Sequence, residues 1–209
     1  MPTGRVFAII PAAGHSRRMG QPKLLLPLDR NRTVIERLLS VLDLSGITER
    51  IVVMRKDETA LREMVQSANA IAIQPDSDPP DMRFSVEEAL ANIASTYGPN
   101  ENDAWLLIPG DYPAIKPSTV QKLLESWAKT PAKILIPTHA GKRGHPVIFS
   151  WTLAAHVTKI PADRGLNTLV HAFTNSVVEV AVSDPGIHLD MDTPEDYEYL
   201  RRLVAEESS

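Results

Sequence analysis

The chain has 209 residues, of which 43% are hydrophobic and 23% are charged, and its formal net charge is −4. The acidic balance argues against a nucleic-acid-binding protein, and the lack of any cysteine excludes disulfides and thiolate metal sites. No apolar run approaches the ~20 residues of a membrane span and no signal peptide is evident, so we expect one cytoplasmic domain over residues 1–209.

Short apolar runs alternate with amphipathic segments along the chain. The runs predicted as strands are Val6–Ile10, Ile51–Met54, Ala70–Ile73, Trp105–Ile108, Ile134–Ile136, Val147–Phe149 and Val177–Val182. Between them, capping signals predict helices that begin near Thr33, Asp57, Ser85, Pro117 and Thr193. Continuous apolar runs are typical of strands buried on both faces. The pattern therefore favours an α/β fold of three layers, with helices on both sides of a doubly wound, mainly parallel sheet.

The first apolar run ends in a turn of small residues. The turn residues are Ala12, Ala13 and Gly14. Three cations, Arg17, Arg18 and Lys23, follow within nine residues. Small residues let backbone N–H groups approach an anion closely, and the cations neutralise it. The patterns G-x-x-x-x-G-K-[ST] and G-x-G-x-x-G are both absent, so the turn is no Walker A loop and not a dinucleotide site. It predicts a phosphate-binding loop of another kind.

Carboxylates follow two later segments. Asp111 comes soon after the apolar run at 105–108, at the carboxyl end of a strand in the same predicted sheet. Magnesium takes one or two carboxylates together with phosphate oxygens, so Asp111 is a candidate metal ligand. The alternative is that it caps the helix after Pro117 or serves a turn. Asp190 and Asp192 lie two residues apart on an expected short strand, where they share one face, and their alternative is a capping role.

The first loop resembles the A-A-G-x-S-x-R-M-G-x-P-K signature of nucleotidyltransferases. Within that superfamily the chain is most similar to the molybdenum cofactor cytidylyltransferases and their relatives. The matching residues are Ala12, Ala13, Gly14, Ser16, Arg18, Met19, Gly20, Pro22 and Lys23. Later motifs follow in the family's order, so the resemblance covers nearly the whole chain. They are Gly110-Asp111-Tyr112-Pro113, Gly144-His145-Pro146 and Asp190-Met191-Asp192-Thr193-Pro194.

This resemblance implies a nucleotide-diphospho-sugar-transferase-like fold and transfer of a nucleoside monophosphate to a phosphorylated acceptor with release of pyrophosphate. It implies CTP as donor, since the guanylyl branch usually reads A-G-G at the loop, and a molybdopterin-type cofactor as acceptor. The implied nucleotide-binding residues are Ala12, Ala13, Gly14, Arg18, Lys23, Ser85 and Asp111, of which Arg18, Lys23 and Asp111 are catalytic. The implied Mg²⁺ ligands are Asp111 with Asp190 or Asp192, and the implied acceptor-binding residues are His145 and Asp163. Residues 1–115 would form the nucleotide half, residues 116–209 the acceptor half, and a molybdoenzyme or its chaperone would receive the product.

Four positions depart from the family pattern. Gln74 stands in place of an asparagine, Asp81 in place of a glycine, Tyr112 in place of a methionine and Asn167 in place of an arginine. These departures leave the acceptor open, and three alternatives remain. The first is another cytidylyltransferase, such as one acting on an isoprenoid precursor, although its H-D-x-x-R-P motif does not occur here. The second is a sugar-phosphate nucleotidyltransferase, and the third is a non-catalytic accessory protein on the same fold.

Overall fold

A mixed sheet forms the centre of the computed structural model, which describes residues 4–161 and 163–207. Its strands are β1 (Val6–Pro11), β2 (Glu49–Val53), β3 (Ile71–Ile73), β4 (Ala104–Leu107), β5 (Ile134–His139), β6 (Lys142–Arg143), β7 (Val147–Ser150) and β8 (Val177–Ala181). They lie in the order β3-β2-β1-β4-β7-β5-β6, and β8 pairs with β5. The pairs β1–β2, β2–β3, β1–β4 and β5–β8 are parallel, whereas β7 is antiparallel to both β4 and β5. The predicted mainly parallel sheet is confirmed.

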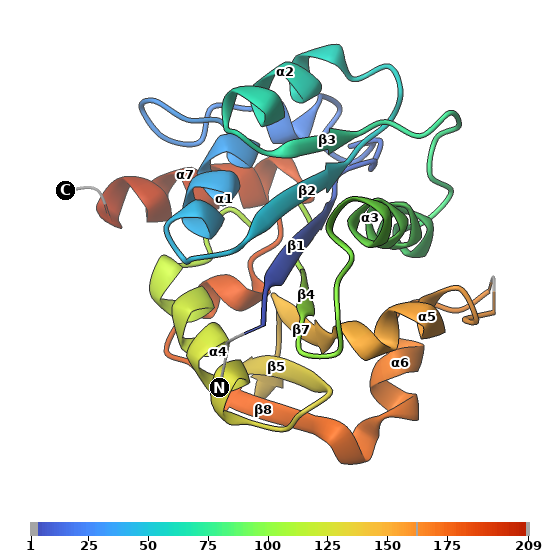
Figure 1. Cartoon of the computed structure of the whole chain (residues 1–209). Helices are drawn as coiled ribbons and strands as arrows, with labels where there is room; N and C mark the ends of the chain where they lie inside the picture. The colour runs from blue at the N-terminus through green and yellow to red at the C-terminus, as the bar shows by residue number, and fades with distance from the viewer. Residues whose placement is uncertain (1–3, 162, 208–209) are drawn as a thin grey trace.

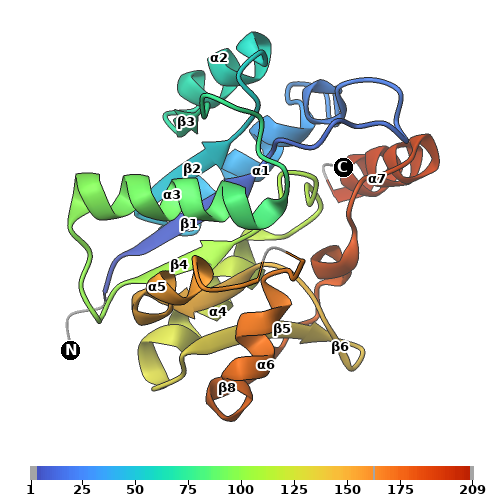
Figure 2. The same cartoon turned by 90° about the vertical axis from the view of Figure 1, so that its right-hand side faces the viewer.

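Helices cover both faces of this sheet. They are α1 (Val34–Asp43), α2 (Thr59–Ser67), α3 (Met82–Tyr97), α4 (Pro117–Lys129), α5 (Ala154–Val157), α6 (Asn167–Ala172) and α7 (Pro194–Glu207). Figure 1 shows α1, α4 and α7 on one side of the sheet and α3, α5 and α6 on the other, and Figure 2 looks onto the second side. Alternate residues of β1 enter the two cores, with Ala8 and Ile10 in one and Phe7 and Ile9 in the other. The three predicted layers follow from this alternation.

Helix starts agree with the sequence signals at some places and differ at others. Thr33 caps α1 in a capping box with Glu36, as predicted. The predicted start of α3 at Ser85 is wrong, because Asp81 caps the helix by accepting a hydrogen bond from the amide of Phe84 at 2.8 Å. A good N-cap four residues earlier moves Ser85 inside the helix, where it is buried. The predicted cap at Asp57 is also wrong, since Glu58 precedes α2 without a side-chain cap.

The segment that holds Asp190 and Asp192 is irregular, and the predicted short strand is wrong. It lies between a 3₁₀ turn at Pro185–His188 and α7. The amide of Met191 donates to the carbonyl of Asp111 at 3.0 Å. The amide of Asp192 donates to the carboxylate of Asp196 at 3.1 Å, in the cap of α7. These contacts use the backbone groups that a strand would need, and they fix the segment against the end of β4 instead.

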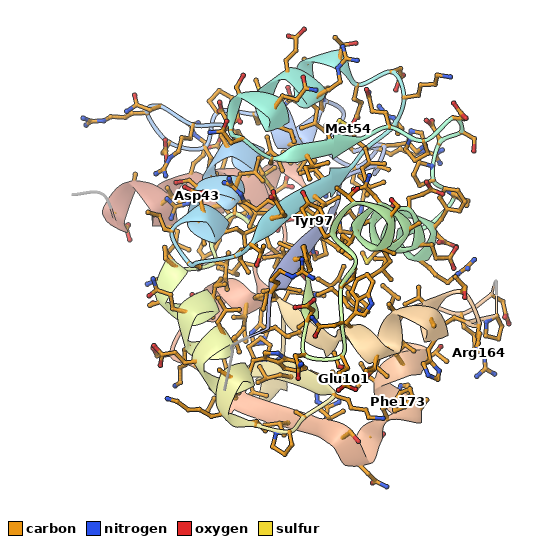
Figure 3. The ribbon with its side chains drawn as sticks, in the orientation of Figure 1. Asp43, Met54, Tyr97, Glu101, Arg164 and Phe173 are labelled. Carbon is orange, nitrogen blue, oxygen red and sulfur yellow. The ribbon has the colours of Figure 1, made fainter. Side chains whose placement is uncertain are left out.

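A buried carboxylate joins the starts of β1 and β4. Asp103 accepts hydrogen bonds from the amide of Arg5 at 2.7 Å, from its guanidinium at 2.7 Å and from the amide of Asn100 at 2.9 Å. Arg5 also donates to the carbonyl of Tyr97 at the end of α3. The ring of Tyr97, which is labelled in Figure 3, packs on Phe7 at 5.3 Å between ring centroids. The network therefore fixes two neighbouring strands and one helix at the amino edge of the sheet.

We expect Asp103→Asn to lower the free energy of unfolding by about 1–3 kcal/mol at pH 7, because it weakens a buried, charged hydrogen-bond acceptor. Burial alone would raise the pKa of Asp103, but hydrogen bonds from Arg5 and Asn100 outweigh it and lower the pKa. The stabilisation is thus complete above the unfolded-state pKa of about 3.9 and is lost as pH falls through the folded-state value. Urea unfolding at pH 7 and pH 3 should show the deficit shrinking at the lower pH. Glu198→Gln, at an exposed helical ion pair, is the control that should change little.

Candidate active site

The loops that follow β1 and β4 lie side by side at the carboxyl edge of the sheet (Figure 2). The two strands are parallel neighbours, and the amide of Gly110 continues their ladder by donating to the carbonyl of Pro11 at 3.0 Å. The strand order reverses between β1 and β4, which is where ligands bind in open α/β sheets. The small-residue turn and Asp111 are therefore brought to one place.

A pocket of about 560 Å³ opens at this place, a volume suited to a small ligand. It is lined by the loop after β1, the start of α3 with the segment before it, and the end of β4. The lining residues include Ala12, Ala13, Gly14, Arg17, Lys23, Asp81, Ser85, Gly110 and Asp111. The structure thus gathers every residue that the resemblance assigns to the nucleotide except Arg18, which lines an adjoining pocket of about 400 Å³ together with Lys23 and Asp111.

The loop after β1 offers unused backbone donors. Within the described part of the chain, the amides of Ala13, Gly14 and His15 donate to no other protein group. The loop is nevertheless fixed at both ends. The amide of Ala12 donates to the carbonyl of Val53 at 2.8 Å, and the hydroxyl of Ser16 accepts from the amide of Lys23 at 3.3 Å. Ordered amides with no partner are what an anion-binding loop needs.

Lys23 joins the loop to the two segments that carry the carboxylates. Its Nζ donates to Asp111 Oδ2 at 2.5 Å, to the carbonyl of Met191 at 2.8 Å and to Asp192 Oδ1 at 3.0 Å. Burial alone would lower the pKa of Lys23, but the charges and hydrogen bonds of Asp111 and Asp192 outweigh it and raise the pKa. Arg18 donates to Asp192 Oδ2 at 2.6 Å. Burial alone would raise the pKa of Asp192, but the hydrogen bonds and charges of Lys23 and Arg18 outweigh it and lower the pKa.

Asp111 is the carboxylate whose surroundings fit a divalent cation best. Its Oδ1 is buried and has no hydrogen-bond partner among the described residues, while Oδ2 meets Lys23. The alternative role as a cap of α4 is wrong, because Asp184 accepts from the amide of Lys116 at 2.9 Å and from the Thr119 hydroxyl at 2.7 Å at that helix start. A carboxylate oxygen without a donor in a pocket that suits phosphates is chemically suited to Mg²⁺.

The other two acidic candidates lie beside Asp111. Asp192 is held by Lys23 and Arg18, whereas Asp190 is an exposed residue that forms no ion pair within the described chain. Partial desolvation of its carboxylate raises the pKa of Asp190, and the nearby charges of Asp192 and Asp111 raise it further. Across the described residues, no group of three or more histidine and acidic side chains is arranged as a ready-made metal cage. The three carboxylates converge, but Lys23 stands between two of them.

A second pocket, of about 530 Å³, has Tyr112 in its wall. Its lining includes Tyr112, Arg143, Gly144, His145, Asn167, His171 and His188, and no acidic residue. His145 is packed edge-on against Tyr112 at 5.0 Å between ring centroids. Burial lowers the pKa of His145, which keeps the imidazole neutral at pH 7, and its buried Nδ1 has no partner in the described chain. The pocket therefore combines the neutral imidazole of His145 with one fixed cation, Arg143, and two further histidines.

Some residues of this second pocket differ from the sequence expectation. Asp163 is exposed in the turn before α6 and does not line the pocket. The sequence reasoning missed Arg143, His171 and His188. One signal was available, because His171 follows Asn167 by four residues and so lies on the same face of a helix. Because the short helix α6 was not predicted, the four-residue spacing of Asn167 and His171 did not indicate a shared face.

The chain is similar to known proteins over most of its length. A family model described as a MobA-like NTP transferase domain matches residues 8–178. The molybdenum cofactor cytidylyltransferase of Escherichia coli (strain K12) is 24% identical over 192 residues, which cover 92% of this chain and 93% of that protein. The purine catabolism protein PucB of Bacillus subtilis (strain 168) is 26% identical over 212 residues, which cover 96% of this chain and 98% of that protein.

Solved structures extend the likeness to the whole fold. The crystal structure of Rv0371c from Mycobacterium tuberculosis H37Rv is 27% identical, has a TM-score of 0.79 and covers 96% of this chain and 99% of that chain. A second structure, of Rv0371c in complex with manganese, is 26% identical with a TM-score of 0.73 and covers the same shares of the two chains. The likeness therefore spans both pockets.

The unused amides and Arg17 together predict a binding site for a polyanion. Arg17 lines both the 560 Å³ pocket and its neighbour, and it forms no ion pair with another described residue. We expect Arg17→Ala to weaken the binding of inorganic tripolyphosphate roughly tenfold, the effect of losing one charge-assisted contact. Isothermal titration calorimetry measures this. Arg30→Ala removes the same charge from an exposed position outside both pockets and should leave the affinity unchanged. Equal losses in the two variants would assign the effect to overall charge.

Proposed function

Because this chain belongs to the family of MobA-like NTP transferase domains, we propose that it transfers CMP from CTP to the phosphate of a small acceptor. The nucleotidyltransferase class follows from the family. The proposal adds the identity of the nucleotide and of the acceptor, which would be a molybdopterin-type molybdenum cofactor. The observation that carries it is the 560 Å³ pocket, where the unused amides of the first loop meet Ser85 and Asp111.

The reaction needs no protein nucleophile. An acceptor phosphate oxygen attacks the α-phosphorus of the triphosphate, the bond from the α-phosphorus to the bridging oxygen breaks, and pyrophosphate leaves. The amides of residues 13–15, with Arg17, Arg18 and Lys23, would bind the triphosphate and neutralise the charge that develops on the leaving group. Asp111, with Asp190 or Asp192, would hold Mg²⁺. When bound, that ion supplies charge neutralisation and polarises the phosphates.

The choice of CTP rests on the sequence of the first loop and on a relative. Ala12, Ala13 and Gly14 match the cytidylyl branch, and the similar protein from E. coli is named a cytidylyltransferase. The departure at Asp81 does not conflict with nucleotide binding, because this residue caps α3 and keeps Ser85 in the pocket wall. The fold and these motifs support the enzyme over a non-catalytic accessory protein, which would have no use for a joined set of phosphate-binding and acidic groups.

The acceptor would occupy the second pocket, with His145 at its wall. In this proposal residues 1–115 form the nucleotide half and residues 116–209 the acceptor half. All residues that line the 560 Å³ pocket belong to the first half, and most of those that line the second pocket belong to the second. The second candidate is an acceptor other than molybdopterin. Asn167 favours it, because this residue stands where the family has a positively charged arginine, and the relative PucB is named for purine catabolism. We propose a cytoplasmic location and a molybdoenzyme or its chaperone as receiver of the product. In the described residues, no helix has the length and apolar character to cross a membrane.

We expect CTP to bind at least tenfold more tightly than GTP, ATP or UTP in the presence of Mg²⁺. The expectation follows from the cytidylyl character of the first loop. Calorimetric titration with each nucleotide measures the preference, and pyrophosphate release on adding molybdopterin tests the acceptor. A preference for GTP would contradict the nucleotide assignment. Tight CTP binding without pyrophosphate release would instead move the acceptor to another phosphorylated compound.

We expect Asp111→Asn to reduce turnover at least a hundredfold while the melting temperature stays within a few degrees. The change keeps size and polarity, but a neutral amide is a much poorer ligand for a hard cation. An aspartate that served only a turn would tolerate asparagine. Asp76→Asn, on an exposed loop, is the control that should keep full activity. Full activity in Asp111→Asn would refute the assignment of this carboxylate to the metal.

A further inference from the structure

The ammonium group of Lys23 uses all of its hydrogen-bonding capacity within the protein. A lysine has three N–H donors and no acceptor. Here the three donors meet three oxygens, from the Asp111 carboxylate, the Met191 carbonyl and the Asp192 carboxylate, at 2.5, 2.8 and 3.0 Å. Carboxylate and carbonyl oxygens are also the ligands that hard divalent cations prefer. The ammonium of Lys23 therefore occupies the oxygen ligands that a divalent cation would need.

The cluster around this ammonium is half-buried and acidic. The side chains of Lys23, Asp111 and Asp192 are 11%, 20% and 26% exposed. Two cations, Lys23 and Arg18, stand against three carboxylates, the third being Asp190. Among residues 4–161 and 163–207, Lys23 is the cation paired with Asp111, and Arg18 pairs with Asp192, so removing Lys23 would leave Asp111 without an ion pair there. Uncompensated carboxylates in a partly buried place bind a cation strongly.

The ammonium of Lys23 cannot donate hydrogen bonds to all three of these oxygens and to a triphosphate at the same time. It lines the 560 Å³ pocket as well as the acidic cluster, so its ammonium lies at the junction of the two. Its backbone is fixed by the 3₁₀ turn at Lys23–Leu25 and by the hydrogen bond from its amide to Ser16. The flexible four-carbon stem can turn the charged end toward the pocket without moving that backbone.

We propose that Lys23 is the resident cation of the Asp111–Asp192 pair, which it keeps closed to divalent ions until a metal–triphosphate complex arrives and draws the ammonium to the phosphates. The inference rests on the proposed function, because it concerns the same metal and triphosphate. It assigns Lys23 two positions, one on the carboxylates and one on the nucleotide. The lack of a ready-made metal cage among the described residues agrees with the first position.

Two consequences follow from this exchange of cations. The free protein binds divalent ions weakly, because an ion must displace an ammonium that already satisfies the same oxygens. Triphosphate and metal favour each other, because the phosphates supply a new partner for Lys23 at the moment when the metal replaces it. Such coupling is reciprocal between the two ligands. Lys23 would thus determine that the metal enters together with the nucleotide.

The test measures Mn²⁺ binding to the nucleotide-free protein by electron paramagnetic resonance, with no acceptor present. We expect Lys23→Ala to bind Mn²⁺ at least tenfold more tightly than the unaltered chain. Lys23→Gln, which is neutral but keeps two N–H donors, should show a smaller gain, and Lys23→Arg, which keeps the charge, should show none. Arg30→Ala is the control, since it removes one positive charge from an exposed position outside both pockets. Melting curves verify that each variant is folded.

A parallel titration with CTP and Mg²⁺ tests the second position of Lys23. The same Lys23→Ala change should weaken CTP binding at least tenfold, opposite in sign to its effect on Mn²⁺. Unchanged or weaker Mn²⁺ binding in both neutral variants would overturn the resident-cation role, and unchanged CTP affinity would overturn the transfer of Lys23 to the phosphates. The Mn²⁺ measurement involves no nucleotide or turnover, so failure of the proposed function would leave its result intact.

Discussion

The parallel pairing of β1 with β4 is the constraint on which the site depends. Because the two strands are neighbours and run in the same direction, the loops that follow them leave the sheet at one edge. One loop carries backbone donors and cations, and the other carries Asp111. The segment at residues 189–193 reaches the same edge through the hydrogen bond from the Met191 amide to the Asp111 carbonyl. Three parts of the chain that are far apart in sequence thereby meet around Lys23.

Opposite charges are interleaved at this meeting point. Lys23 bridges Asp111 and Asp192, Arg18 pairs with Asp192, and these ion pairs outweigh burial and lower the pKa of Asp192. Asp190 lacks such a partner among the described contacts, and burial and its acidic neighbours raise its pKa. Two cations, Lys23 and Arg18, therefore stand against three carboxylates. A triphosphate with its metal could enter by exchanging partners, without bringing a large net charge into a partly buried place.

The departures from the family pattern have different physical consequences. Asp81 takes over the N-cap of α3, so the loss of a glycine is compensated locally by a hydrogen bond to Phe84. Tyr112 lines the second pocket and packs on His145. Asn167 leaves a position without charge in a pocket whose other polar residues are mostly basic. Tyr112 and Asn167 thus both change the lining of this pocket, but only Asn167 removes a charge from it, and His171 lies one helical turn away.

The sequence by itself determined the strands that bear the candidate site and the three-layer class, because these depend on local patterns of apolar and capping residues. It also singled out the loop after β1 and Asp111, which the structure brings to one pocket. It did not determine the start of α3, where a stronger cap at Asp81 prevailed over the motif at Ser85. Nor did it give the irregular backbone around Asp192. The tertiary structure alone decided that Lys23 lies on the carboxylates. Its three hydrogen-bond partners are 88, 168 and 169 positions away along the chain, and contacts at such separations leave no periodic pattern in a sequence.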